Sequence, residues 1–301
     1  MSTILKTEVL IIGAGPSGIS AAIQLKRNKI KTIILEQSKP GGLMLNANLI
    51  ENYPGFPNGI KGVDLANLFL KQYKDIGGVI DFEKALKVNF NQSINILTNK
   101  RIIQTEYLIV ASGTTGIKLP VILDSVDTRR RFFTEIDIIK GVSKKRIIIL
   151  GSGDCAFDYA LSLAPRNRIW IVGRSKRYKC LDLLYEKASR IKGIKYLPDT
   201  TVEDIQQKNN EIIVTCTDKR ILVADLLVFA IGRKPNLEFM GKKNMEENLI
   251  PKDMIYYIGD VTNSSNRQVS ICVGNGVLAA VKISEILRKK WKSLQKLEEK
   301  I

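Results

Sequence analysis

Two glycine-rich turns in the chain have the residue types and the spacing of phosphate-binding turns. The first is GAGPSG at Gly13–Gly18, and the second is GSGDCA at Gly151–Ala156. In such a turn the first glycine permits a sharp bend, the second lets the backbone approach a pyrophosphate, and the third small residue lets helix and strand pack closely. N–H groups at the start of the following helix then bind the phosphates. Two such sites in one chain indicate that electrons pass between two bound dinucleotides.

The residues that follow the two turns differ in charge. Glu36 ends the strand after the first turn, 23 residues beyond Gly13, where a carboxylate accepts hydrogen bonds from a ribose diol. The strand after the second turn ends in a basic segment, GRSKRYK, and four of its side chains would attract a 2′-phosphate: Arg174, Lys176, Arg177 and Lys179. We therefore expect NADP(H) at the second site, with NAD(H) as the other possibility. The alternative reading, a solvated basic loop after an edge strand, stays open.

Several kinds of catalytic chemistry are excluded by the residues that the chain lacks. It contains no histidine, which rules out a histidine general base or metal ligand. Its four cysteines form no CxxC, and the nearest two, Cys155 and Cys180, are 25 positions apart. A local redox disulfide and a metal site are therefore not expected, although two distant cysteines could still meet in space. The reaction must be carried by a bound cofactor.

Composition and charge set limits on the class of protein and on its partners. The chain has 301 residues, 45% hydrophobic and 26% charged, which suits about two globular domains. The N-terminus runs directly into a strand, and no unbroken apolar run reaches the ~18 residues of a membrane span, so we expect a cytoplasmic protein. The net charge of +17 favours an acidic partner, while nucleic acid, an anionic membrane and a merely lysine-rich background composition are the alternatives. The clusters Arg129–Arg131 and Arg288–Lys292 lie in no nucleic-acid-binding motif and are interpreted as surface charge or a docking face.

The elements that must position these turns form an internal repeat. Each turn follows an apolar strand, Glu8–Gly13 or Arg146–Gly151, and precedes a helix and a second strand, and the two turns lie 138 residues apart. This arrangement predicts two Rossmann-like halves of an α/β fold. Three further apolar strands end in small residues, where ligands bind at the carboxyl edge of a parallel sheet: Tyr107–Gly113, Leu226–Gly232 and Met254–Asp260. From Gly274 the pattern becomes helical.

A succession of short motifs resembles the low-molecular-weight thioredoxin reductase family over nearly the whole chain. The motifs are GAGPSG, Gly41–Gly42, IENYPGF (Ile50–Phe56), ASGT (Ala111–Thr114), GSGDCAFDYAL, AIGRKPN (Ala230–Asn236), IGDV (Ile258–Val261) and RQVSICVGNGVLAA (Arg267–Ala280). The resemblance implies two Rossmann-like dinucleotide-binding domains of the three-layer ββα type. It places an NAD(P)H-binding domain at 116–235, inserted into an FAD-binding domain of 1–115 and 236–301. It also implies a homodimer.

The resemblance assigns residues to the two cofactors. Those implied for FAD are Gly13, Gly15, Pro16, Ser17, Gly18, Glu36, Gly41, Gly42, Asn52, Ala111, Gly113, Gly259, Asp260, Arg267, Gln268 and Val269. Those implied for NADP(H) are Gly151, Gly153, Asp154, Ala156, Arg174, Ser175, Lys176, Lys179 and Gly232. Tyr53 and Phe132 are candidates for stacking on the flavin.

Two departures from the family pattern affect the expected function. Thioredoxin reductases carry a CxxC just before the second nucleotide-binding strand, but this chain has no cysteine between Thr128 and Ile149. The family's HRR phosphate motif is replaced by Gly173, Arg174 and Ser175. The chain is therefore similar to the thioredoxin reductase-like ferredoxin:NADP oxidoreductases, which lack the dithiol.

We accordingly expect an FAD-dependent oxidoreductase that moves electrons between NADP(H) and ferredoxin or a similar acidic one-electron carrier, with no catalytic residue other than the flavin itself. One alternative is an NAD(P)H oxidase or a diaphorase-like reductase of small acceptors. The less favoured readings are a thioredoxin-type disulfide reductase and a non-catalytic sensor that binds FAD and nucleotide.

Overall fold

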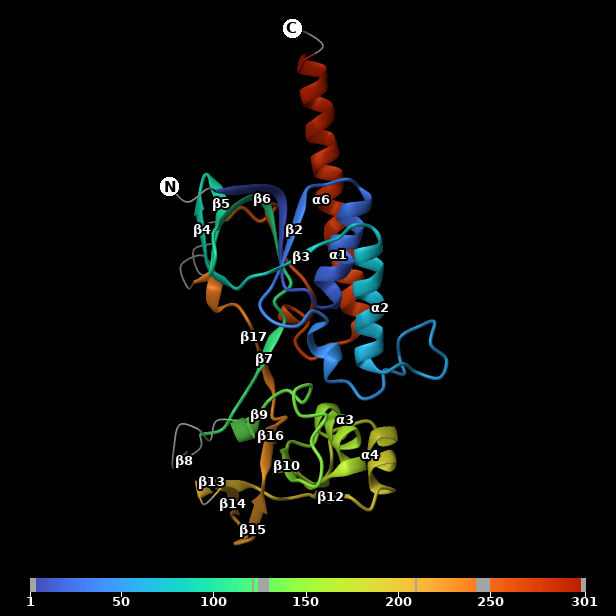
Figure 1. The fold of residues 1–301 in the computed structure, drawn as a ribbon, viewed down its shortest axis with the longest axis vertical. Coiled ribbons are helices and arrows are strands. Elements are labelled where there is room, and N and C mark those ends of the chain that lie inside the picture. The colour runs from blue at the N-terminus through green and yellow to red at the C-terminus, as the bar shows by residue number, and fades with distance from the viewer. Residues whose placement is uncertain (1–3, 121, 124–129, 209, 242–249, 299–301) are drawn as a thin grey trace.

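The computed structural model describes residues 4–120, 122–123, 130–208, 210–241 and 250–298. These residues form two α/β units, which lie one above the other in Figure 1. A narrow antiparallel ribbon of β7 (Thr114–Gly116) and β17 (Arg233–Pro235) runs between them. The chain therefore crosses from the first unit to the second and back at one place.

The first unit is built on a parallel sheet in which the first glycine turn follows the central strand. The strand order is β3-β2-β1-β6, and β18 pairs with β6 on the outer side. The strands are β1 (Leu5–Ile12), β2 (Thr32–Glu36), β3 (Ile80–Phe82), β6 (Ile102–Val110) and β18 (Ile255–Tyr257). The interior strands β1 and β6 are continuously apolar at their carboxyl ends, as expected for a sheet covered on both faces.

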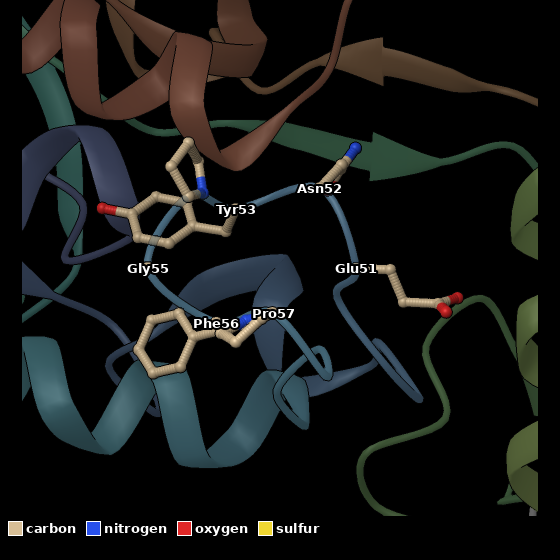
Figure 2. A pocket seen from close by; sticks show the side chains of 7 residues that line it. Glu51, Asn52, Tyr53, Gly55, Phe56 and Pro57 are labelled. Carbon is tan, nitrogen blue, oxygen red and sulfur yellow. The ribbon is translucent and has the colours of Figure 1, made fainter.

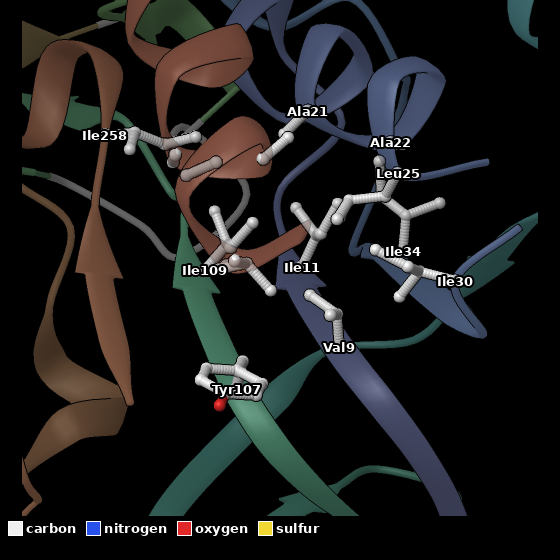
Figure 3. Packing of buried hydrophobic residues seen from close by; sticks show 14 of the residues in the cluster. Val9, Ile11, Ala21, Ala22, Leu25, Ile30, Ile34, Tyr107, Ile109 and Ile258 are labelled. Carbon is white, nitrogen blue, oxygen red and sulfur yellow. The ribbon is translucent and has the colours of Figure 1, made fainter. Parts of the chain in front are cut away.

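Helices cover one face of this sheet and an antiparallel meander covers the other. The helices are α1 (Pro16–Arg27), α2 (Gly62–Asp75) and α6 (Val269–Glu298). Figure 3 shows Val9 and Ile11 of β1 packing beneath Ala21, Ala22 and Leu25 of α1. The meander consists of β4 (Ala85–Asn91), β5 (Ser93–Thr98) and the first half of β6. These are the three layers expected from the sequence.

Helix α6 begins at Val269, five residues before the start expected at Gly274. Glycine lowers helix propensity, so Gly274 and Gly276 read as a helix start rather than as helix interior. The structure shows why a glycine is present, because a Cβ on Gly276 would collide with the carbonyl oxygen of Ser17 in α1. Close packing of α1 against α6 therefore outweighs the local preference of the sequence.

The second unit repeats the same plan. Its parallel sheet has the order β12-β11-β10-β16-β9 and is covered by helices α3 (Asp154–Leu163) and α4 (Asp182–Ser189). The strands are β9 (Phe132–Phe133), β10 (Arg146–Leu150), β11 (Arg168–Val172), β12 (Ile194–Leu197) and β16 (Leu226–Phe229). A second sheet covers the other face, with β8 (Ile122–Leu123) parallel to the first strand of a meander of β13 (Val202–Lys208), β14 (Glu211–Cys216) and β15 (Ile221–Ala224). The predicted fold of two Rossmann-like α/β domains is confirmed.

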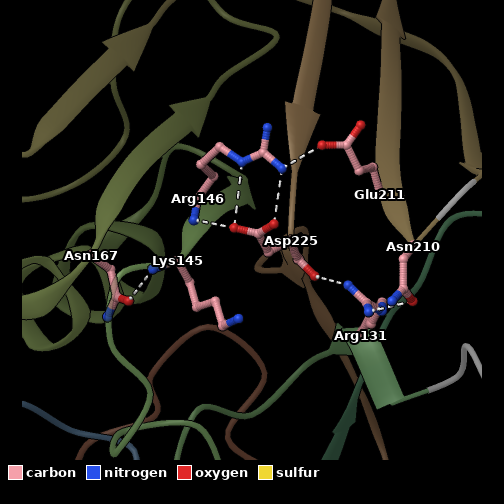
Figure 4. A network of polar contacts seen from close by, with 7 residues as sticks. All are labelled: Arg131, Lys145, Arg146, Asn167, Asn210, Glu211 and Asp225. Carbon is pink, nitrogen blue, oxygen red and sulfur yellow. Dashed lines mark hydrogen bonds and ion pairs between the residues drawn. The ribbon is translucent and has the colours of Figure 1, made fainter.

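A polar network fixes the amino end of β10, far from its glycine turn (Figure 4). Arg146 Nη2 lies 2.9 Å from Asp225 Oδ1 and 2.7 Å from Glu211 Oε1, and the hydrogen bonds from Arg146 lower the pKa of Asp225. Arg131 donates to the carbonyl oxygen of Asp225 and to Asn210 Oδ1. Arg131 is therefore occupied within the fold, whereas Arg130 is exposed and Arg129 lies outside the described residues.

One helix of the described residues, Val269–Gln295 within α6, is long and apolar enough to cross a membrane. The core helix of a globular protein meets the same criteria of length and composition, and Ala280, Ile283 and Leu287 are fully buried against the first unit. The sequence had given no expectation of a membrane segment. Burial accounts for only part of this composition, because a third of the most apolar window is buried and side chains such as Leu278 and Leu294 are exposed.

Candidate functional site

The outer glycines of the two turns are required by the fold. Gly13 has φ +106° and Gly151 has φ +138°, a region that residues with a Cβ rarely adopt. A Cβ on Gly13 would lie 2.8 Å from the carbonyl carbon of Ala111, and one on Gly151 would lie 2.9 Å from that of Ala230. A Cβ on Gly18 would strike the carbonyl oxygen of Gly13. These positions allow a strand to turn directly into a tightly packed helix.

The middle glycines have no such structural requirement. Gly15 has φ −77° and ψ −175°, and Gly153 has φ −92° and ψ −178°, values open to any residue. A Cβ on Gly15 would come no closer than 4.0 Å to another atom, and one on Gly153 would have no neighbour within 4 Å. Each is also the N-cap of its helix, without a side-chain capping bond. The missing Cβ leaves room for a ligand to approach free helix N–H groups, as a pyrophosphate does.

The residues around the first turn form a cradle of backbone and carboxylate. Glu36 Oε2 accepts a hydrogen bond from Ala14 N at 3.0 Å, and its Oε1 accepts one from Ser38 N at 2.9 Å. Because each carboxylate oxygen has two acceptor sites, Glu36 can still receive a ribose hydroxyl. Gly41 N donates to Ala14 O at 2.8 Å, which brings Gly42 alongside Gly15. The predicted ADP-binding residues of the first site are thus brought together.

The far end of the first site is formed by the segment before α6. Asn52 Nδ2 donates to Gln268 Oε1 at 2.7 Å, so two residues 216 positions apart meet here. Within the part of the chain that the structure describes, Arg267 Nε is buried without a hydrogen-bond partner. A buried guanidinium donor with no acceptor is costly, and a polar cofactor would remove that cost. The glycine cradle and this orphan donor fit FAD.

Several predicted FAD residues also have structural roles. Ser17 is buried and packs where a Cβ on Gly259 would lie. The carbonyl group of Ala111 lies against Gly13, and Gly113 has open space around it. Asp260 Oδ1 accepts a hydrogen bond from Cys272 Sγ at 3.2 Å, and burial raises the pKa of that thiol.

An open hollow lies beside this end of the site, lined by residues 51–57 (Figure 2). Glu51 points toward the second unit, while Tyr53 and Phe56 lie on the loop itself with ring centroids 6.1 Å apart. Tyr53 therefore lies beside Asn52 at the predicted flavin end. The other stacking candidate, Phe132, is buried in the second unit against Phe229 and cannot reach a flavin without disrupting that core.

The basic loop of the second site folds back over its glycine turn. Lys179 N donates to Ser152 O at 2.6 Å, and Asp154 Oδ1 accepts a hydrogen bond from Leu181 N at 2.8 Å. Asp154 therefore holds the loop in place. The basic side chains predicted to bind phosphate are all exposed and form no ion pair among the described residues: Arg174, Lys176, Arg177 and Lys179.

The two units meet through residues that motif analysis missed. Asn46, at the end of the short helix Gly42–Leu45, donates from Nδ2 to Glu135 Oε2 at 2.7 Å. Glu135 also pairs with Arg233 Nη2 at 2.6 Å, and burial raises the pKa of the carboxyl despite that cation. Asp158 of α3 accepts a hydrogen bond from Asn48 N at 2.9 Å. Asp158 and Arg233 lie within quoted motifs that assign them no such contact. No local pattern marks Asn46, Asn48 or Glu135, because their partners lie about a third of the chain away.

The four cysteines form no disulfide with one another in the structure. All four are free thiols, and Cys216 and Cys272 are buried. Cys155 in α3 is exposed and Cys180 is half-buried, and desolvation by the surrounding protein raises the pKa of each thiol to about 11. No group of three or more metal-ligating side chains gathers within the described residues.

Comparison with known proteins places this architecture in a family. Residues 7–276 match the pyridine nucleotide-disulphide oxidoreductase family. The chain belongs to this family. It is an FAD- and NAD(P)-dependent oxidoreductase of the thioredoxin reductase type.

The relatives include disulfide reductases and one protein known by its operon. Thioredoxin reductase of Borreliella burgdorferi is 25% identical, covering 93% of this chain and 92% of its own. A 34.2 kDa protein in the rubredoxin operon of Clostridium pasteurianum is 27% identical, covering 91% and 95%. The fold is similar to that of Lactococcus lactis thioredoxin reductase, with a TM-score of 0.82 at 22% identity over 94% of this chain and 99% of that one.

Proposed function

We propose that the protein transfers electrons from NADPH through FAD to an acidic one-electron carrier, ferredoxin or a similar protein, without a disulfide intermediate. The observation that carries the proposal is the segment before β10. Where the family resemblance leads one to expect a dithiol, this segment presents Thr134, Glu135 and Asp137. The two cysteines that are not buried have pKa values raised to about 11.

We assign FAD to the first site and NADP(H) to the second, with the domain limits of the sequence analysis. Gly15 and Gly153 leave space for the two pyrophosphates, and Glu36 orients a ribose. Arg267 supplies its free Nε donor at the flavin end, beside the bonded pair of Asn52 and Gln268. When bound, a flavin accepts two electrons as hydride and can release them one at a time.

The charge of the chain supports an acidic acceptor. A net charge of +17 steers a negatively charged protein toward the surface and raises the association rate at low salt. Rubredoxin is a second carrier to test, since one relative is named for its place in a rubredoxin operon. We expect carrier reduction to slow by about tenfold or more as salt rises from low to high, whereas flavin reduction by NADPH changes little.

The test is anaerobic mixing of the purified protein with NADPH or NADH, followed by an oxidised carrier. Bleaching of the flavin band near ~450 nm reports hydride transfer, and its return reports electron transfer to the carrier. We expect rapid bleaching by NADPH and salt-sensitive reoxidation by ferredoxin or rubredoxin. Reoxidation by air or quinone alone would instead identify an oxidase or diaphorase. A flavin that neither nucleotide bleaches would identify a non-catalytic binding protein.

Disulfide reduction is the second candidate, because the relatives include thioredoxin reductases and a bacillithiol disulfide reductase of Staphylococcus aureus. It is tested by NADPH-dependent reduction of thioredoxin. We expect none, and we expect a variant with all four cysteines replaced by serine to reduce the carrier as the natural chain does. Thioredoxin reduction that disappears in this variant would favour the disulfide reductase.

We also propose a cytoplasmic homodimer, to be checked by light scattering of the purified protein.

A further inference from the structure

The two units follow the same plan, so equivalent positions can be compared through their backbone hydrogen bonds. In the first unit, Gly13 N donates to the carbonyl oxygen of the residue before Glu36, at 2.8 Å. In the second unit, Gly151 N donates to the carbonyl oxygen of the residue before Gly173, at 2.9 Å. Gly173 is therefore the counterpart of Glu36. The second site has no side chain at the position where the first site carries its carboxylate.

A side chain from the neighbouring strand fills this place. Tyr196 of β12 pairs with Ile171 of β11, which lies two residues before Gly173, so the three positions share one face of the sheet. A Cβ on Gly173 would lie 2.8 Å from the Tyr196 hydroxyl oxygen and 3.0 Å from Ser152 Cβ. The hydroxyl therefore stands where a side chain of residue 173 would begin, beside the glycine turn. The equivalent residue of the first unit is Ile80, which has no polar group in its side chain.

Two aromatic neighbours hold the ring of Tyr196 in place. Its centroid lies 5.4 Å from that of Phe157 in α3 and 6.2 Å from that of Tyr185 in α4, with interplanar angles of 60° and 81°. Inclined contacts of this kind are favourable between aromatic rings, and Phe157 is itself fully buried in the core of the second unit. The packing therefore fixes the position of the hydroxyl group.

The hydroxyl group of Tyr196 has an unused hydrogen. Within the described residues its oxygen is buried and forms no hydrogen bond, although Ser152 is near enough to lower the pKa of the phenol. Burial is the larger effect and raises that pKa, so the phenol keeps its proton at neutral pH. A buried hydroxyl without a partner destabilises the fold, and an acceptor atom on a ligand would remove this cost.

The basic loop brings positive charge to the same place. Lys179 N donates to Ser152 O at 2.6 Å, so the loop is bound to the residue that the tyrosine hydroxyl faces. Arg174, which directly follows Gly173, is exposed. A proton donor and cationic side chains together suit a negatively charged acceptor. At this end of a dinucleotide the 2′-phosphate of NADP(H) is such an acceptor, whereas the 2′-hydroxyl of NAD(H) is neutral.

We propose that Tyr196 is a specificity-determining residue of the second nucleotide site, where its hydroxyl donates a hydrogen bond to the 2′-phosphate of NADP(H). The proposal rests on the proposed function in one respect, the presence of NADP(H) at this site. A carboxylate such as that of Glu36 accepts hydrogen bonds and would repel the phosphate. A phenol in the same place donates to it, and the bond is stronger than one to a neutral ribose hydroxyl.

The test is calorimetric titration of the FAD-containing protein and its Tyr196→Phe variant, which loses the hydroxyl but keeps the ring. The ligands are NADP⁺, NAD⁺ and 2′,5′-ADP, a fragment that carries the 2′-phosphate without the nicotinamide. We expect the variant to bind NADP⁺ and 2′,5′-ADP about tenfold more weakly and NAD⁺ less than about threefold more weakly. Equal losses for NADP⁺ and NAD⁺, or an unchanged affinity for NADP⁺, would overturn the proposal.

The matched control is Tyr178→Phe, which removes a hydroxyl from the same aromatic cluster. The Tyr178 hydroxyl bonds Asp182 Oδ1 of α4 at 2.9 Å, and its ring stacks on Tyr185, a contact that phenylalanine retains. This variant should bind all three ligands within about twofold of the natural chain. A loss of NADP⁺ affinity as large as that of Tyr196→Phe would show a general effect of the cluster and overturn the proposal.

Thermal unfolding without nucleotide separates a ligand-binding hydroxyl from a structural one. Tyr196→Phe should be as stable as the natural chain or more stable, because it removes a buried group that has no partner there. A clear loss of stability would overturn the proposal. A natural chain that binds neither NADP⁺ nor 2′,5′-ADP would refute NADP(H) at the second site and Tyr196 with it. Tight binding that the variant retains would refute the role of Tyr196 alone.

Discussion

The middle glycine of each turn offers a way to separate what the fold requires from what a ligand requires. Gly15→Ala and Gly153→Ala place a methyl group where the described structure has open space, on a backbone that alanine adopts freely. Alanine also restricts the unfolded chain more than glycine does. We therefore expect each substitution to leave the free energy of unfolding of the cofactor-free protein unchanged or raised by about 0.4–1 kcal/mol.

The same methyl groups should be far more costly to binding. Each would stand at the point where the turn backbone approaches a pyrophosphate, in front of uncapped helix N–H groups. We expect Gly15→Ala to weaken FAD binding by about 100-fold, which corresponds to about 2.8 kcal/mol, with NADPH affinity unchanged. Gly153→Ala should have the converse effect, a similar loss for NADPH with FAD retained. Flavin absorbance of the purified protein and calorimetric titration with each nucleotide measure the two affinities.

Gly18→Ala is the control, because its Cβ would collide with the carbonyl oxygen of Gly13 and force α1 away from β1. This variant should lower the thermal stability of the cofactor-free protein, as overpacking does by about 1–3 kcal/mol. The reasoning would be refuted if Gly15→Ala bound FAD normally. It would equally fail if Gly15→Ala destabilised the cofactor-free protein as much as Gly18→Ala does.

Three further predictions follow from the site. Arg267→Met should lower FAD affinity by about tenfold or more, which flavin titration measures. It should not destabilise the cofactor-free protein in thermal unfolding, because it removes a buried donor that has no partner there. Replacing Arg174, Lys176 and Arg177 by glutamine should weaken NADPH binding by about tenfold or more and leave NADH binding unchanged, as calorimetry would show. Burial raises the pKa of Asp158, so its carboxylate costs stability as pH rises through that pKa. The stability of the Asp158→Asn variant relative to the natural chain should therefore increase as the pH rises, which thermal unfolding from pH 4 to 8 measures. A difference in stability between the two proteins that stays constant over this range would contradict the prediction.

Much of the fold could be read from the sequence because its determinants are local. The strands that precede Gly13 and Gly151 are short apolar runs, and a glycine ends each of them because the backbone there has a positive φ that residues with a Cβ rarely adopt. The repeat of this pattern was enough to predict two Rossmann-like units. Where tertiary packing overrides local preference, as at Gly276 in α6, the expected helix start was wrong by five residues.

The site was only partly predictable, because its polar contacts join distant residues of no distinctive type. Asn46 and Glu135 are 89 positions apart, and Asn48 and Asp158 are 110 apart. Their chemistry is that of ordinary surface residues until the two units bury them together. Phe132 failed as a flavin-stacking candidate for a related reason, since its exposure depends on the sheet in which it pairs.

The cysteines bear on the proposal that this chain works without a redox dithiol. Thiol–disulfide exchange requires a thiolate, and a pKa of about 11 at Cys155 leaves on the order of 10⁻⁴ of that thiol ionised at neutral pH. Cys180 is no more reactive by this measure. Even if these two residues met, they would be poor substitutes for a redox dithiol. The proposed transfer of electrons directly from the flavin to a carrier accordingly needs neither of these thiols.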